Sequence, residues 1–414
     1  MASTLPLGRR RFLGGLAAGS IAGNLGTWVQ AQSTDAAADP ASAPLTRTPL
    51  SLMAPRSDGC EAVWAVRSAC LGRLEWHAEE GPGAAGTSGM DAFGFVPQDE
   101  QVIRVRCAGL RPGTRYRIRA ITRSTDGRRE ETSPWKSFRT LDPDAASTSF
   151  VVWNDTHLNA TTLRRLHAVT PAADFLVWNG DTCNDWTTQE LLVPTLLHPA
   201  ECDITEGRPL CLVWGNHDVR GRHAHAMPRV VATPQHRPYY AFRSGPVAAV
   251  FLNTGEDKPD THPGFGGRVA FDVLRREQAA WLETVLREPA MKNAPYRVVF
   301  CHIPLRWLDE SVQDYSQSGF DRHSGRSRAA WHEALARWRA QVVVSGHTHH
   351  DAWLPPVREF PYGQLVGGGP SPTGATWMHG QADRERLEIT VRALDGTIKH
   401  AIRIHPGRRG IATA

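Results

Sequence analysis

The sequence predicts an α/β protein in which a small all-β sandwich precedes a larger domain built on sheets flanked by helices. Three observations predict this class. A chain of 414 residues is too long for one ordinary hydrophobic core, so two folded units are expected. Residues 50–141 contain only short β-type runs separated by turn residues. After residue 142, fully apolar runs alternate with helical patterns, which is typical of a sheet covered on both faces.

The composition is that of a globular protein. Hydrophobic residues make up 41% and charged residues 21% of the chain. The formal net charge is +5, but part of it lies in Arg9, Arg10 and Arg11, and no long basic run follows. Nucleic-acid binding is therefore not indicated, whereas a basic pocket for a small anionic substrate is compatible with the charge. Beyond the N-terminus, no apolar stretch reaches the roughly 20 residues of a membrane span.

The N-terminus has the order of an export signal. Arg9–Leu13 has the twin-arginine form R-R-x-F-L, a weakly apolar stretch covers 14–25, and Val29–Ala31 offers a small-residue cleavage site. The alternative is a disordered basic tail that precedes a hydrophobic run by chance. We expect residues 1–31 to be a twin-arginine signal peptide that directs the protein to the periplasm or outside the cell. Residues 32–49, rich in Ala, Pro, Ser and Thr, are expected to be a flexible linker.

The cysteine pattern does not decide whether the protein contains a disulfide. Their number, seven, is odd, so at least one is unpaired within the chain, and no C-x-x-C of the zinc-binding kind is present. An oxidising destination would permit a disulfide. One pair among Cys60, Cys70 and Cys107 is conceivable, but the sequence does not choose it.

Residues 50–143 are predicted to form the β sandwich. The segment Leu110–Tyr116, L-R-P-G-T-R-Y, resembles the turn-plus-tyrosine signature of fibronectin type III domains, in which the tyrosine hydroxyl ties a strand start to the preceding loop. Trp64 and Trp76 are expected to fill its core. The expected strands are Glu61–Val66, Gly72–His77, Gln101–Cys107, Arg115–Thr122 and, closing the sandwich, Ser137–Thr140.

Residues 144–406 are predicted to form the α/β domain, with a tail at 407–414. Apolar residues at helical spacing occur in Arg275–Arg287 and Ala329–Arg339. Two late strands, expected to complete a second sheet, are Leu387–Val391 and Ile398–Ile404. The buried strands expected before them are Ser149–Trp153, Asp174–Trp178, Leu210–Trp214, Val247–Leu252, Arg297–Cys301 and Gln341–Val344.

Polar clusters follow five of these strands, at the carboxyl ends where open α/β sheets place ligand sites. The clusters are N-D-T-H at 154–157, N-G-D at 179–181, G-N-H-D at 215–218, C-H-I-P at 301–304 and G-H-T-H at 346–349. They offer carboxylate, imidazole and amide oxygen and require no sulfur. Such a set suits two divalent or trivalent ions such as Mn, Fe or Zn. A glycine directly before Asp181, Asn216 and His347 removes the Cβ where the backbone must turn sharply beneath an ion.

In this order the clusters resemble the pattern D-x-H, G-D, G-N-H-[DE], H and G-H-x-H of the calcineurin-like metallophosphoesterases, over roughly residues 150–352. A single G-D or G-H-x-H is common by chance as a turn, but five elements in order at strand ends are not. The resemblance implies a two-sheet sandwich flanked by helices and a pair of metal ions. It assigns Asp155, His157 and His349 to the first metal, Asn216, His302 and His347 to the second, and Asp181 to a bridging position.

The two residues after Asn216 are the candidate catalytic pair, His217 and Asp218. The resemblance makes His217 the acid or electrostatic partner of the leaving oxygen. Two cations that share Asp181 would lower the pKa of a water enough to form hydroxide near neutral pH. They would also neutralise the phosphate oxygens during an in-line displacement.

The chain also resembles the purple acid phosphatase branch, in which a fibronectin-like domain precedes the metal domain. It departs from that branch at two positions. The branch has a tyrosine ligand three residues after the bridging aspartate, where this chain has Asn184, and it usually reads G-N-H-E, where this chain has Asp218. The resemblance therefore implies the architecture and the dinuclear chemistry, but neither the tyrosinate-to-iron colour nor a ferric first site.

Other residues near the clusters have two interpretations. Cys183 could touch a metal, but a packed thiol is the favoured interpretation. Arg306 could meet a phosphate oxygen or be a solvated loop residue. His350 and Asp351 are candidates for fixing the orientation of His349.

The favoured activity is hydrolysis of a small phosphomonoester or phosphodiester. The loops that would decide between these two classes carry no readable motif. The alternative is a non-catalytic phosphate- or surface-binding protein that retains the fold. Such proteins commonly lose metal ligands, and here none is missing. A third interpretation is hydrolysis of a phosphoanhydride or a phospholipid head group at the same metals.

Overall fold

The computed structural model describes residues 43–80, 85–91, 93–308, 324–406 and 411–413. The expected signal peptide and most of the expected linker therefore lie outside the described residues. Within these ranges, the structure contains no helix whose length and apolar character would let it cross a membrane.

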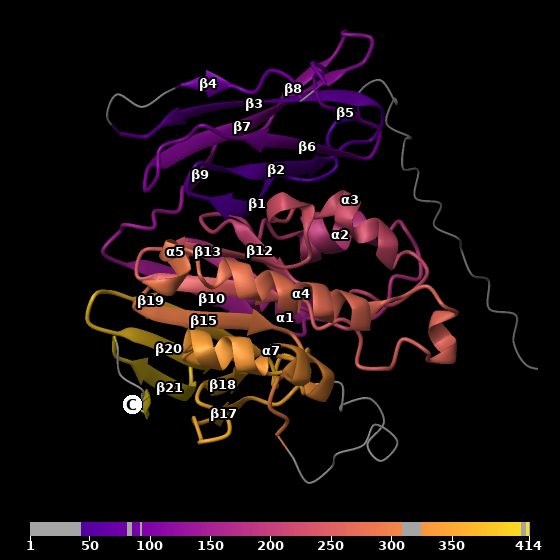
Figure 1. Ribbon diagram of the computed structural model, residues 1–414. Helices are drawn as coiled ribbons and strands as arrows, with labels where there is room; N and C mark the ends of the chain where they lie inside the picture. The colour runs from indigo at the N-terminus through magenta and orange to yellow at the C-terminus, as the bar shows by residue number, and fades with distance from the viewer. Residues whose placement is uncertain (1–42, 81–84, 92, 309–323, 407–410, 414) are drawn as a thin grey trace, which may run out of the picture. The chain divides into compact units, whose positions relative to one another are not determined.

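Two sheets form the centre of the chain (Figure 1). The first sheet has ten strands, in the order β22 (Ile411–Thr413), β21 (Ile398–Ile404), β20 (Leu387–Ala393), β19 (Thr376–Ala382), β10 (Thr148–Trp153), β11 (Phe175–Asn179), β12 (Leu210–Val213), β1 (Ser51–Arg56), β2 (Gly59–Ala65) and β6 (Val102–Cys107). The second has six strands, in the order β13 (Tyr240–Ser244), β14 (Val247–Leu252), β15 (Tyr296–Cys301), β16 (Val342–Ser345), β18 (Gly363–Val366) and β17 (Ala352–Leu354).

The core between the two sheets follows from the alternation of side chains along the strands. In β10, Phe150 and Val152 are buried against the second sheet, whereas Val151 and Trp153 are buried on the opposite face. The ring of Phe150 lies 5.6 Å, centroid to centroid, from that of Phe300 in β15. Both faces of these strands are covered, which explains why the sequence shows fully apolar runs.

Helices cover the outer face of each sheet. On the first sheet these are α1 (Ala160–Val169), α2 (Leu192–Leu197) and α3 (Met227–Val230). On the second they are α4 (Phe271–Val285), α5 (Pro289–Lys292) and α7 (Ser324–Trp338) (Figure 1). Leu282 of α4 and Trp331 of α7 are fully buried there. The predicted two-sheet α/β class is confirmed. Short 3-10 turns occur at η1 (Pro199–Glu201), η2 (Ala224–Ala226), η3 (Pro234–His236) and η4 (Pro263–Phe265).

A third sheet packs on the end of the first. Its strands are β4 (Gly86–Thr87), β3 (Cys70–Ala78), β7 (Arg115–Ser124) and β8 (Glu130–Thr132), with β5 (Gln98–Asp99) beside β3 and β9 (Lys136–Arg139) beside β7. Trp64, Tyr116 and Phe138 fill the core between this sheet and strands β1, β2 and β6. The Tyr116 hydroxyl accepts a hydrogen bond from the backbone N–H of Arg111 at 3.1 Å, the contact expected from the sequence. The likeness to fibronectin type III domains stays a prediction.

The last residues of the expected linker pair with the β region. Leu45 is buried, the N–H of Arg47 donates to the carbonyl of Ala65 at 2.8 Å, and Thr46 forms a bridge to Val66. These residues therefore extend the β region toward the N-terminus. At the other end of the chain, the expected tail contains β22, which pairs with β21.

The cysteines all lie in the described ranges, and each is a free, buried thiol. Cys60 and Cys107 are directly opposite one another on the neighbouring strands β2 and β6. Burial raises the pKa of Cys107 to about 12, so this thiol is protonated at neutral pH. Cys70 lies in the other sheet of the sandwich, opposite Asp99 and Ser124.

Candidate metal centre

The predicted ligands come from loops that follow five parallel-paired strands. Asp155 and His157 follow β10, Asp181 follows β11 and Asn216 follows β12, all in the first sheet. The second sheet contributes His302 after β15, with His347 and His349 after β16. Because parallel strands end at the same edge of a sheet, the loops meet where the two sheets lie face to face.

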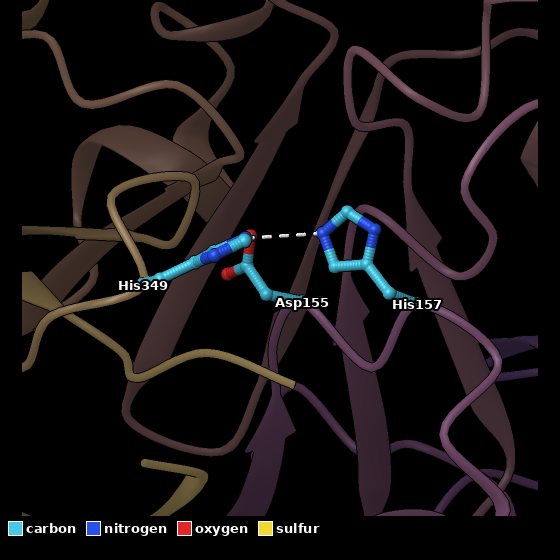
Figure 2. A group of neighbouring side chains, drawn as sticks. All are labelled: Asp155, His157 and His349. Carbon is cyan, nitrogen blue, oxygen red and sulfur yellow. Dashed lines mark hydrogen bonds and ion pairs between the residues drawn. The ribbon is translucent and has the colours of Figure 1, made fainter. Parts of the chain in front are cut away.

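The structure brings all seven predicted ligands together. Asp155, His157 and His349 offer one ligand atom each within 4.8 Å of one another, and Asp181, His302 and His347 form a second group on the same criterion. In Figure 2 the side chains of His157 and His349 point toward each other beside Asp155. Their ring planes are 78° apart, and their Nε2 atoms lie 3.1 Å apart.

Asp181 lies between the two groups. Its Oδ2 is 3.4 Å from Nε2 of His157 and 3.2 Å from Nε2 of His302. The amide oxygen of Asn216 joins the second group, at 2.8 Å from Nδ1 of His347 and 3.1 Å from Nε2 of His302. The arrangement has the form of two ligand sets with one shared carboxylate.

The charges of this cluster suit cations. Burial raises the pKa of Asp155 to about 7. Burial also lowers the pKa of His347 to about 3 and that of His349 to about 4, so both imidazoles are neutral and have a free nitrogen for a metal. Burial opposes charge on His302 as well, but the carboxylates of Asp181 and Asp155 raise its pKa to about 10. Cations at this place would compensate the same carboxylates. The donor set therefore fits a metal pair.

The backbone of the ligand loops is strained. Five of the predicted ligands have positive φ angles, a region that non-glycine residues rarely adopt and that costs about 1–3 kcal/mol each. The angles are 47° for Asp155, 43° for His157, 53° for Asp181, 72° for His347 and 58° for His349. Such strain persists only where the surrounding structure enforces it, and here it coincides with the ligand cluster.

Glycines make room for the ligand side chains. A Cβ on Gly180 would lie 2.4 Å from Nδ1 of His302. A Cβ on Gly215 would lie 2.2 Å from Oδ1 of Asp181. A Cβ on Gly346 would lie 2.3 Å from the Asp155 carboxylate. No side chain fits at these positions unless a ligand moves.

The two candidate catalytic residues lie in different environments. The side chain of His217 is 26% exposed, its ring centroid is 4.8 Å from that of His157, and its Nδ1 contacts the carbonyl of Asn184. Asp218 is fully buried. Its carboxylate accepts hydrogen bonds from the backbone N–H groups of Asp181 at 2.8 Å and Gly215 at 2.9 Å. Asp218 therefore holds two ligand loops together beneath the site, and its catalytic role stays a prediction.

Asn184 occupies the position at which the resembling branch has a tyrosine. Its Oδ1 lies 3.0 Å from Nδ1 of His157. An amide oxygen only accepts hydrogen bonds, so this contact keeps the proton on Nδ1 and leaves Nε2 of His157 for a metal.

The remaining sequence candidates lie outside the ligand set. Cys183 is a packed thiol, and burial raises its pKa. Arg306 donates to the carbonyl of Pro355 at 3.0 Å. The carboxylate of Asp351 contacts the ring of His400, with Oδ2 of Asp351 3.0 Å from Nε2 of His400.

Three charged residues beside the cluster were not predicted from the sequence. Glu256 and Asp257 follow β14, another strand that ends at this edge, and both are buried. Arg220 lies four residues after Asn216 and contacts both carboxylates. The pattern that could have indicated them is a pair of acidic residues shortly after a buried strand, although this pattern matches no known motif.

Comparisons with known proteins identify a family for most of the α/β region and a similar fold for the chain. Residues 148–351 match the family model of the calcineurin-like phosphoesterases. No curated protein matches the chain. Among solved structures, a purple acid phosphatase from yellow lupin (Lupinus luteus) seeds is similar in fold, with a TM-score of 0.63, 14% identity, and coverage of 87% of this chain and 75% of that one.

Two bacterial structures match less well. A predicted phosphoesterase from Streptococcus pneumoniae has a TM-score of 0.31 and 11% identity, and covers 63% of this chain and 99% of that one. A metallophosphoesterase from Sphaerobacter thermophilus has a TM-score of 0.24 and 12% identity, with 56% and 83% covered.

Fold and site together define a metal-dependent phosphoric ester hydrolase with a dinuclear centre. Residues 148–351 belong to the calcineurin-like phosphoesterases, and the architecture around them is like that of a purple acid phosphatase. The match to the family, predicted from five clusters, is confirmed.

Proposed function

We propose that the protein is an exported phosphoesterase that hydrolyses small phosphomonoesters or phosphodiesters at a pair of metal ions. One observation carries this proposal. The buried carboxylate of Asp181 lies between two groups of ligand atoms, 3.4 Å from Nε2 of His157 in one and 3.2 Å from Nε2 of His302 in the other, which is the arrangement required for two cations to act on one phosphate group.

The proposed ligand assignment divides the cluster in two. Asp155, His157 and His349 would hold the first ion, and Asp181 would bridge to the second. The ligands of the second ion would be Asn216, His302 and His347. The donor set of imidazole, carboxylate and amide oxygen suits Mn, Fe or Zn.

The metal ions and the protein would have different roles in the proposed hydrolysis. A bound cation pair would supply a water of lowered pKa and neutralise the charge of the phosphate oxygens. The chain fixes the geometry, because strained loops and the buried carboxylate of Asp218 hold the ligands before substrate arrives. His217, held at Nδ1 by the Asn184 carbonyl, would present Nε2 to the leaving oxygen.

Export is proposed from the N-terminal sequence alone. The twin-arginine form at Arg9–Leu13 carries the proposal. Changing Arg9 and Arg10 together to lysine should retain the protein in the cytoplasm, as measured by cell fractionation. Normal export of that variant would contradict the proposal.

The activity is tested with purified, metal-loaded protein and a panel of p-nitrophenyl monoesters and diesters. We expect turnover of at least one ester class, and a loss of more than about 100-fold in Asp181→Ala, because a shared ligand matters more than a residue that only orients one. Metal analysis of the same samples identifies the ions. Two bound ions and phosphate binding without turnover of any ester would instead favour the non-catalytic binding protein.

A further inference from the structure

The loop after β14 brings two buried carboxylates to the metal centre. Glu256 is 0% and Asp257 1% exposed. Carboxylates are almost never fully buried unless they are paired. Their burial beside a predicted ligand set therefore needs an explanation.

This loop is held from behind by helix α4. Arg275 donates from Nη2 to the carbonyls of Thr254 at 2.7 Å and Glu256 at 2.9 Å. Gln278 accepts from the N–H of Asn253 at 2.8 Å and donates to its carbonyl at 2.8 Å. The two carboxylates thus sit on a rigid support.

Arg220 ties the loop to the ligand loop that follows β12. Its Nε and Nη2 donate to the two carboxylate oxygens of Glu256 at 2.8 and 2.6 Å. Nη2 also lies 3.3 Å from Oδ1 of Asp257, and Lys258 donates to the same Oδ1 at 2.6 Å. Arg220 and Lys258 each contact both carboxyl groups, and Oδ1 of Asp257 is engaged by both cations.

The other oxygen of Asp257 meets the predicted ligand Asn216. Nδ2 of Asn216 donates to Oδ2 of Asp257 at 3.4 Å, while its Oδ1 faces His302 and His347. A carboxylate only accepts hydrogen bonds, so it can face the amide NH₂ group but not the amide oxygen. If the Asn216 amide were rotated by 180°, its N–H groups would point at the second cation.

We propose that Asp257 is a positioning residue that fixes the Asn216 amide so that its oxygen, not its nitrogen, faces the second metal. Arg220 and Lys258 hold Asp257 in place for this role. The inference rests on the proposed ligand role of Asn216. The alternative is a charge cluster that only anchors two loops, and it predicts a loss of stability without a selective loss of metal.

The test is a calorimetric titration of metal-free protein with Mn²⁺. Wild type should bind two ions. Asp257→Ala should bind the first ion normally and the second about tenfold or more weakly, the range for residues that orient metal ligands. Asp257→Asn should bind the second ion no more tightly than Asp257→Ala does. Its single side-chain oxygen would accept from Arg220 and Lys258, so its NH₂ group would face the NH₂ group of Asn216.

Asp260→Asn is the matched control. Asp260 lies in the same loop region, but its carboxylate accepts from the N–H groups of Phe271 at 3.1 Å and Asp272 at 2.9 Å. This variant should bind both ions like wild type. The inference would be overturned if Asp257→Asn bound the second ion with wild-type affinity, whether or not Asp257→Ala did so too. Equal weakening of both ions in Asp257→Ala would also overturn it.

Asn216→Ala separates this inference from the proposed function. Failure of wild type to bind two ions would refute the dinuclear proposal itself. If wild type binds two ions and Asn216→Ala loses the second while the Asp257 variants keep it, only the role of Asp257 is refuted. Melting temperatures of the metal-free variants report any general loss of stability.

Discussion

His217 and Asp218 are neighbours in the chain, yet their side chains lie in opposite environments. The His217 ring is partly exposed beside His157, whereas the Asp218 carboxylate is fully buried and accepts hydrogen bonds from the Asp181 and Gly215 backbone. The difference separates a group that can reach a substrate from one that supports the ligands.

Replacement of His217 by alanine should lower turnover and leave the metal content unchanged. The ring lies outside the proposed ligand set, and loss of a general acid costs typically about 10²–10⁴-fold in rate. Steady-state kinetics and metal analysis on one sample measure both. Unchanged turnover, or loss of metal, would remove His217 from the proposed role.

Replacement of Asp218 by alanine should affect stability as well as metal binding. The change leaves the N–H groups of Asp181, Thr182 and Gly215 without their acceptor, and each unpaired buried donor costs about 1–3 kcal/mol. The free energy of unfolding of the metal-free protein should fall by about 3 kcal/mol or more, measured in urea. A variant as stable as wild type would contradict this account.

The predicted ligands could be read from the sequence because each follows a buried strand. The parallel strand ends meet at one edge, so separate motifs converge. The environment of Asp218 could not be read, since the direction of its side chain depends on the turn that follows β12. Asp257 was missed because its contact with Asn216 depends on Arg220, and this trio has no fixed spacing that a motif could record.

At the scale of elements, the ligand loops depend on glycine. Gly215 follows β12 by two residues, and a Cβ there would lie 2.2 Å from Oδ1 and 2.3 Å from the backbone nitrogen of Asp181. The strand can therefore deliver Asn216 to the site only if the preceding residue lacks a side chain.

Gly215→Ala should displace Asp181 and weaken metal binding. Overpacking of this kind destabilises by about 1–3 kcal/mol, and the displaced carboxylate is the shared one. Gly325→Ala is the control, because no atom of the described residues lies within 4 Å of its added Cβ and helix α7 favours alanine by up to about 1 kcal/mol. Melting curves with and without Mn²⁺ compare the two. Equal Mn²⁺ stabilisation in both variants would argue against the role of Gly215.

The sequence predicted many strands of the two central sheets but missed others, among them the seven-residue β19 in the middle of the first sheet. Val247–Leu252 and Ile398–Ile404 were predicted with their observed bounds, because their apolar runs or alternation are clear. β17, with three residues, and β18, with four, were not predicted. Such short segments carry little periodicity, and their pairing is set by contacts distant in sequence.

At the scale of the whole molecule, the first sheet continues from the metal domain into the β sandwich. β1 pairs in parallel with β12, with Met53 opposite Leu210. Beside this junction, Lys136 of β9 is buried and donates to Asp203 at 2.6 Å, to Thr205 at 3.0 Å and to the carbonyl of Leu50. The sequence predicted separate units because no local pattern records a pairing across more than 150 residues.

Lys136→Met should lower the stability of the chain as one unit. The change leaves a partly buried carboxylate and a buried carbonyl without their donor, at a cost of about 1–3 kcal/mol. Calorimetry should show a single transition at lower temperature, because the sheet couples the two regions. The exposed Lys399→Met should remain within about 0.5 kcal/mol of wild type. Two separate transitions would contradict the coupling.

The continuous sheet also restricts how such a protein can diversify. A sandwich that contributes three strands to its neighbour's sheet cannot be exchanged by recombination as an independent module. An ancestor that lost it would expose the hydrogen-bonding edge of β12, which invites aggregation. Related chains that carry a different N-terminal region should therefore still place some strand or covering segment along β12.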